Sequence, residues 1–187
     1  MSHIKEMRQP IIFMIIFLLF FYLLGKWERH TNHKEDTRYY FKGNISEKSY
    51  DEFVKNIPEG TTTVSLSSGG GDLNTALRLG DFILDKKLHT EVGYNASCSS
   101  ACMYLLISGK TIKIRGKVGL HEPSIHGIKF RHTSGRQRAD LLRAKDSLKA
   151  YTRYRGFSGE IIEYSYTIKS EDMQYLDGEE FFKYRLK

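Results

Sequence analysis

The sequence of 187 residues is poor in cysteine, proline and tryptophan, with two, three and one of them, respectively. The two cysteines, Cys98 and Cys102, therefore have no other disulfide partner within the chain. No spacing of histidine, cysteine and carboxylate residues resembles a metal site, so we expect no metal catalysis. A phosphate-binding loop is also missing, and we expect chemistry that needs neither ATP nor a cofactor.

Acidic residues are fewer than basic ones, which gives a net charge of +7 at pH 7. Much of the basic excess lies in residues 131–155, where Leu141, Ala144, Leu148 and Tyr151 recur at helical spacing. We interpret this segment as a surface helix with a solvated basic face; contact with an anionic lipid surface or an oligomer partner is the alternative. No known nucleic-acid-binding motif accompanies the charge, so we expect no nucleic-acid partner.

One long hydrophobic run lies between Arg8 and Lys26, with seventeen uncharged and mostly large apolar residues. As a helix it would be about 25 Å long, at the short end of what crosses a hydrocarbon core of about 30 Å. No small-x-small cleavage site follows, which favours an uncleaved anchor over the alternative of a cleaved signal peptide. We therefore predict an N-terminal tail and transmembrane helix over residues 1–25, a juxtamembrane linker over 26–38 and a folded domain over 39–187.

Strand-like and helix-like segments alternate after the linker. The β-branched or alternating segments predict strands at 39–45, 61–68, 88–97 and 111–123. Helical periodicity predicts helices that begin after Ser46, over 72–87 and over 99–109. Repeated β-α units indicate an α/β fold with a mostly parallel sheet covered by helices. In such folds functional sites lie where strands end and helices begin.

Two of these junctions carry residues that are suited to chemistry. Glycines 69–71 follow one strand and leave backbone N–H groups uncovered, as an oxyanion hole requires; a plain tight turn is the alternative. The stretch "NASCSSAC" places serines directly before an apolar helix, and a serine there still needs a base. His121 is expected at a strand end and is the candidate base, with a purely structural histidine as the alternative.

The order of these motifs resembles the Clp protease proteolytic subunit of the crotonase-like superfamily, in particular its small membrane-anchored or periplasmic relatives. The resemblance extends over about residues 38–124 and is carried by "FKGNIS", "SSGGGDLNTALRLGDFI", "SACMYLLISG" and "GLHEP". It implies that Ser100 is the nucleophile and His121 the general base. It also implies that the backbone amides of Gly71 and Ala101 form the oxyanion hole.

The third member of the triad has no clean counterpart. The segment "SEDMQYLDGEEFFKYRL" resembles the closing turn and helix of the family, but the expected acidic position falls near Lys169. We take Asp172 as the substitute, while a serine–histidine dyad or a different orienting group stays open. The interval from Ser100 to His121 is also a few residues shorter than the family's usual interval. Without an acid, the tautomer of the histidine would be less firmly set.

The resemblance implies a membrane-anchored, ATP-independent serine protease or peptidase that cleaves peptides or unfolded proteins by acyl-enzyme chemistry. The alternative is a catalytically inactive relative that binds peptides or organises a complex. We also expect a homo-oligomer. We expect a single-pass protein of the bacterial inner membrane, with its short tail inside and its domain in the periplasm or outside the cell.

Cys98 and Cys102 stand four residues apart, one on each side of Ser100. On one helical face their Cα atoms would be about 6 Å apart, which a disulfide tolerates. The oxidising compartment that this topology implies would let the bond form. Our hypothesis is a bridge that fixes the turn at Ser100, and two packed thiols are the alternative.

If residues 1–25 anchor the chain, full-length protein should sediment with membranes and resist extraction by alkaline carbonate. The physical reason is that apolar side chains, which carbonate does not displace, hold a transmembrane helix in the bilayer. Protease added outside the inner membrane should digest the chain beyond residue 26. Release of a shorter mature form would instead indicate a cleaved signal peptide.

Overall fold

The computed structural model of the protein describes residues 14–22, 37–123 and 135–187. The chain divides into two compact units, residues 1–36 and 37–187. In the first unit, residues 14–22 are helical; the rest of the predicted anchor and almost all of the predicted linker lie outside the described residues. None of the helices in the described ranges has both the length and the hydropathy that a membrane span requires.

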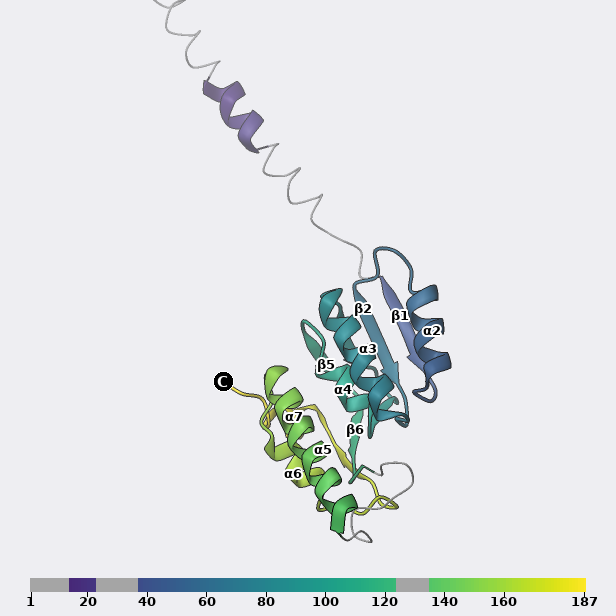
Figure 1. The fold of residues 1–187 in the computed structure, drawn as a ribbon. Coiled ribbons are helices and arrows are strands. Elements are labelled where there is room, and N and C mark those ends of the chain that lie inside the picture. Colours follow the sequence, from purple (N-terminus) through teal and green to yellow (C-terminus); the bar gives the residue numbers. More distant parts are fainter. Residues whose placement is uncertain (1–13, 23–36, 124–134) are drawn as a thin grey trace, which may run out of the picture. The chain divides into compact units, whose positions relative to one another are not determined.

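The second unit contains two sheets whose strands are mostly parallel (Figure 1). The first sheet has four strands, all parallel to their neighbours, in the order β1 (Arg38–Lys42), β2 (Thr63–Ser67), β3 (His89–Val92) and β5 (Ile112–Ile114). The second has three strands, β4 (Ser97–Ser99), β6 (Lys117–Leu120) and the antiparallel β7 (Gln174–Leu176). The predicted α/β fold with mostly parallel strands is therefore confirmed.

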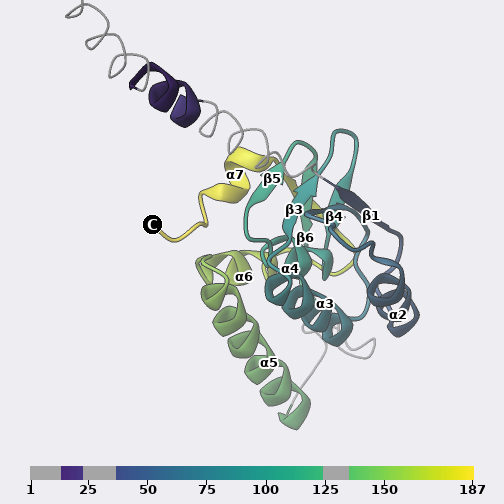
Figure 2. The ribbon, with the colours of Figure 1, turned by 90° about the horizontal axis from the view of Figure 1, so that it is seen from above.

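Six helices surround these strands in the described part of the second unit. They are α2 (Glu47–Asn56), α3 (Leu73–Asp85), α4 (Cys102–Leu106), α5 (Gly135–Tyr154), α6 (Glu160–Ser165) and α7 (Gly178–Phe182). In Figure 2, α2, α3 and α4 lie along one side of the strands and α7 lies on the other. Ser46 caps α2 as predicted, because its hydroxyl accepts a hydrogen bond from the backbone N–H of Ser49.

Three predicted segments have the wrong boundaries. The strand expected over 88–97 is interrupted by a turn at Asn95, whose φ of +59° is tolerated by asparagine better than by most residues. The helix expected over 99–109 begins only at Cys102, because Ser97–Ser99 pair with β6 as the strand β4. The strand expected over 111–123 is likewise two strands, β5 and β6, which belong to different sheets.

A backbone bridge between Ser68 and Cys98 joins the two sheets. The N–H of Ser68 donates to the carbonyl of Ser97, and the N–H of Ser99 donates to the carbonyl of Ser68, both at 2.9 Å. The carboxyl end of β2 therefore lies beside β4, which pairs in turn with β6. The segments that follow these three strands consequently start from one edge, as expected for neighbouring parallel strands.

Candidate active site

Ser100 lies in the turn between β4 and α4, with a φ of +54°. This left-handed conformation costs a residue other than glycine about 1 to 3 kcal/mol, so the surrounding structure must hold it. The N–H of Ser100 donates to the carbonyl of Gly119 at 2.8 Å, and its carbonyl accepts from the N–H of Met103 at 3.1 Å. These two backbone bonds fix the turn that presents the side chain of Ser100.

Gly70 packs directly against this turn. A Cβ atom on Gly70 would lie 2.7 Å from Cβ of Ser100 and 3.1 Å from the backbone nitrogen of Ala101. The φ of Gly70 is also +102°, which side chains disfavour. Sequence reasoning singled out Gly71 and missed this contact, because only the folded structure shows which glycine of the run meets Ser100.

Two backbone amides near Ser100 are available to a ligand. The N–H groups of Gly71 and Ala101 donate no hydrogen bond to any other residue in the described ranges. Gly71 has a φ of +143°, and a Cβ there would collide with the backbone of Ile45. Glycine is therefore required at position 71 for the chain to pass Ile45 and leave its own N–H uncovered.

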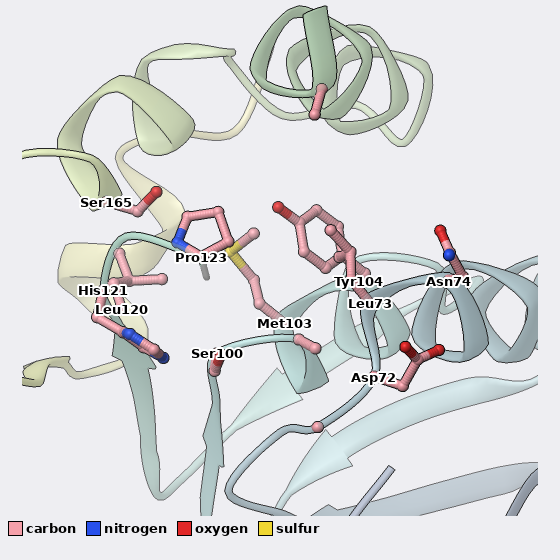
Figure 3. Close-up of a pocket in the computed structure, with 13 residues that line it drawn as sticks. Asp72, Leu73, Asn74, Ser100, Met103, Tyr104, Leu120, His121, Pro123 and Ser165 are labelled. Carbon is pink, nitrogen blue, oxygen red and sulfur yellow. The ribbon is translucent and has the colours of Figure 1, made fainter. Parts of the chain in front are cut away.

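A cavity of about 250 Å³ brings together four of the residues predicted for the site, Gly71, Ser100, Ala101 and His121 (Figure 3). Its other lining residues come from the start of α3, from α4, from the end of β6 and from α5 and α6. They are Asp72, Leu73, Asn74, Met103, Tyr104, Leu120, Pro123, Ala144 and Ser165. Sequence reasoning did not assign any of these to the site.

His121 follows β6 directly, and its imidazole is half-buried on the Ser100 side of the cavity (Figure 3). Burial lowers the pKa of His121 from its ordinary value of 6.5, while the backbone and the charge of Glu122 act in the opposite direction. Nδ1 of His121 is buried and has no hydrogen-bond partner among the described residues. Within the same residues, no hydrogen bond joins the imidazole to Ser100; such bonds often form only once substrate is bound.

The structure does not bring Asp172 to the cavity. Its side chain is exposed, it does not line the cavity, and its backbone N–H donates to the carbonyl of Lys169 in a turn. The acidic residue next to His121 is instead Glu122, which is only 1% exposed. The sequence carried this signal in "GLHEP", where the acid directly follows the histidine.

A disulfide joins Cys98 and Cys102 across Ser100, with their Cα atoms 5.2 Å apart. Both cysteines are fully buried. Cys98 belongs to β4 and Cys102 begins α4, so the bridge closes the strand-to-helix turn. Among the described residues there is no group of three or more histidine, cysteine or carboxylate side chains that could hold a metal ion.

Solved structures that resemble this chain include two proteases. A mutant of 1510-N, a membrane-bound stomatin-specific protease, has 19% sequence identity and a TM-score of 0.56, over 81% of this chain and 78% of that chain. A mutant of ClpP1 from Listeria monocytogenes has 13% identity and a TM-score of 0.59, over 81% of this chain and 88% of that chain. No family model and no curated protein matches the sequence. The chain therefore has a Clp protease-like fold.

Mass spectrometry of unreduced, denatured protein should find no free thiol. Reduction should slow the reaction of Ser100 with a serine-reactive probe but hardly change the melting temperature, because so short a loop adds little global stability and acts on the local turn. A variant with both Cys98→Ser and Cys102→Ser should react slowly with or without reductant. Two free thiols in protein that reacts at full rate would contradict the bridge.

Proposed function

We propose that the protein is a serine peptidase in which Ser100 is the nucleophile and His121 the general base. The observation that carries the proposal is the strained turn at Ser100, which lines one cavity with His121 and with the uncovered amides of Gly71 and Ala101. Backbone strain of this kind is concentrated at functional sites. A serine, a base and two free amide donors are together the requirements of acyl transfer.

In the proposed reaction, Oγ of Ser100 attacks the carbonyl carbon of the scissile peptide bond while its proton passes to the imidazole of His121. The oxyanion that forms accepts hydrogen bonds from the N–H groups of Gly71 and Ala101. The C–N bond then breaks, and the leaving amine takes the proton from the imidazolium. Water, deprotonated by His121, finally hydrolyses the ester and regenerates Ser100.

A catalytically inactive protein that binds peptides in the same cavity is the second candidate. It is favoured by the unpartnered Nδ1 of His121, since no carboxylate among the described residues holds the imidazole in the tautomer that a base needs. The strain at Ser100 favours the peptidase, because binding a peptide does not require a serine in a left-handed turn.

We further propose that the substrate is a peptide or unfolded protein near the membrane, and that residues 1–25 anchor the chain in the bacterial inner membrane with the domain outside. The uncharged run before Lys26 supports the anchor. A disulfide is typical of oxidising compartments, which supports the location of the domain. Independence from ATP and assembly into a homo-oligomer are also part of the proposal.

A fluorophosphonate probe should modify Ser100 and no other residue. Ser100→Ala should abolish labelling and lower peptidase activity by about a thousandfold or more, because it removes the nucleophile. Ser97→Ala, in the same segment but outside the cavity, is the matched control and should keep both the labelling and the peptidase activity. If the Ser100→Ala variant kept its peptidase activity and its melting temperature, Ser100 would not be the nucleophile.

His121 must be neutral to accept the proton of Ser100, so kcat/KM should fall as the pH falls through the pKa of His121. Burial lowers this pKa, so the midpoint of the acid limb should lie below pH 6.5. Glu122→Gln removes a charge that raises the pKa and should move the midpoint to still lower pH. A profile of kcat/KM against pH with a fluorogenic peptide measures the midpoints of the wild type and of the variant. A wild-type midpoint at or above pH 6.5 would indicate another base.

A further inference from the structure

The walls of the cavity beside Ser100 are only slightly more apolar than polar. Six apolar residues contribute to them, namely Leu73, Ala101, Met103, Leu120, Pro123 and Ala144. Its described lining contains no lysine or arginine. A volume of about 250 Å³ is small for an organic ligand but sufficient for one amino-acid side chain.

Tyr104 is one of the residues that bring a polar group to these walls. Its side chain is only 6% exposed, and its hydroxyl points into the cavity (Figure 3). The hydroxyl makes no hydrogen bond with any residue in the described ranges. Burial raises the pKa of Tyr104, so the phenol stays neutral and can both donate and accept a hydrogen bond. A polar group that lines a cavity and has no partner among the described residues is a place where a ligand group can bind.

We propose that this cavity holds the substrate side chain on the acyl side of the cleaved bond, and that Tyr104 selects an uncharged side chain with a hydrogen-bonding end, best met by glutamine. The inference rests on the proposed function, because it takes Ser100 as the point of attack. It goes further by naming the preferred residue and the group that recognises it.

The length of the side chain also matters. Serine, threonine and asparagine carry their polar ends on shorter side chains than glutamine, so these ends extend less far into the cavity. Leucine fits the walls but leaves the hydroxyl of Tyr104 without a partner, which carries a free-energy penalty. Glutamine has both the length and an amide that can donate and accept.

Charged side chains fit less well. A glutamate carboxylate in this cavity would meet no lysine or arginine of the described lining, and burying an unpaired charge is costly. A lysine ammonium would meet one carboxylate, Asp72, but that residue is exposed and already accepts a hydrogen bond from the backbone N–H of Thr75 at 2.7 Å. Glutamine and glutamate have nearly the same shape, so their difference in affinity isolates the effect of charge.

Binding, rather than cleavage, tests the inference. The full-length chain with Ser100→Ala, in detergent, is titrated into fluorescein-labelled peptide amides that differ only in a last residue of Gln, Leu or Glu. The Gln peptide should bind about tenfold more tightly than the Glu peptide. Adding Tyr104→Phe should raise the ratio of the Gln to the Leu dissociation constant about tenfold, because only the Gln side chain loses a hydrogen bond.

Tyr151→Phe is the matched control. The ring of Tyr151 packs 5.9 Å from that of Tyr104, but its hydroxyl lies 3.1 Å from Oγ of Ser108 and does not line the cavity. It should leave the Gln-to-Leu ratio unchanged. Ala144→Phe, which fills the cavity from α5, should weaken both peptides.

The outcomes separate the two proposals. Three outcomes would each overturn the inference. They are a Gln-to-Leu ratio of dissociation constants that Tyr104→Phe leaves unchanged, equal affinity for the Gln and Glu peptides, and no binding of any peptide. Peptide cleavage by the wild-type chain is measured separately. Cleavage without Gln selectivity would support the peptidase and contradict the role of Tyr104. Gln-selective binding without cleavage would support the role of Tyr104 and contradict the peptidase.

Discussion

The candidate site depends on one constraint, the close approach of the chain after β2 to the turn after β4. The hydrogen bonds of Ser68 with Ser97 and Ser99 bring the two segments together, and Gly70 then lies against Ser100 with no room for a side chain. Without this contact, the free amide of Gly71 would not share a cavity with Ser100. Glycine is needed here for proximity as well as for its backbone conformation.

Much of this arrangement follows from local sequence, because strand alternation, helical periodicity and the Ser46 cap are local properties. The junctions where chemistry was expected did converge on one cavity, as parallel strands require. The division of the strands between two sheets was not predictable, since it rests on the pairing of β3 with β5 and of β4 with β6 across intervening segments. The contact of Gly70 with Ser100 and the direction of the Tyr104 hydroxyl could not be predicted either, because both depend on long-range packing.

Burial has the largest effect on the pKa of His121, and of the two acidic residues it is Glu122 rather than Asp172 that acts against it. Glu122 is almost completely buried, so water screens its charge weakly, whereas Asp172 is exposed to solvent and does not line the cavity. In the proposed reaction, this buried negative charge would stabilise the imidazolium that forms when Ser100 loses its proton, although it does not hold Nδ1. The proposed base is therefore supported by charge, while its orientation depends on packing at the end of β6.

The short helix α4 links the position of the Ala101 amide to that of the Tyr104 side chain. Five residues are too few for a stable isolated helix, so α4 owes its stability to burial of all five side chains and to the disulfide at its first residue. The same segment supplies the Ala101 amide before the helix and Tyr104 within it. Because both belong to one rigidly packed turn, a shift that moved the oxyanion donor would also move the phenol in the cavity. Proposed chemistry and proposed selectivity therefore depend on the same packing.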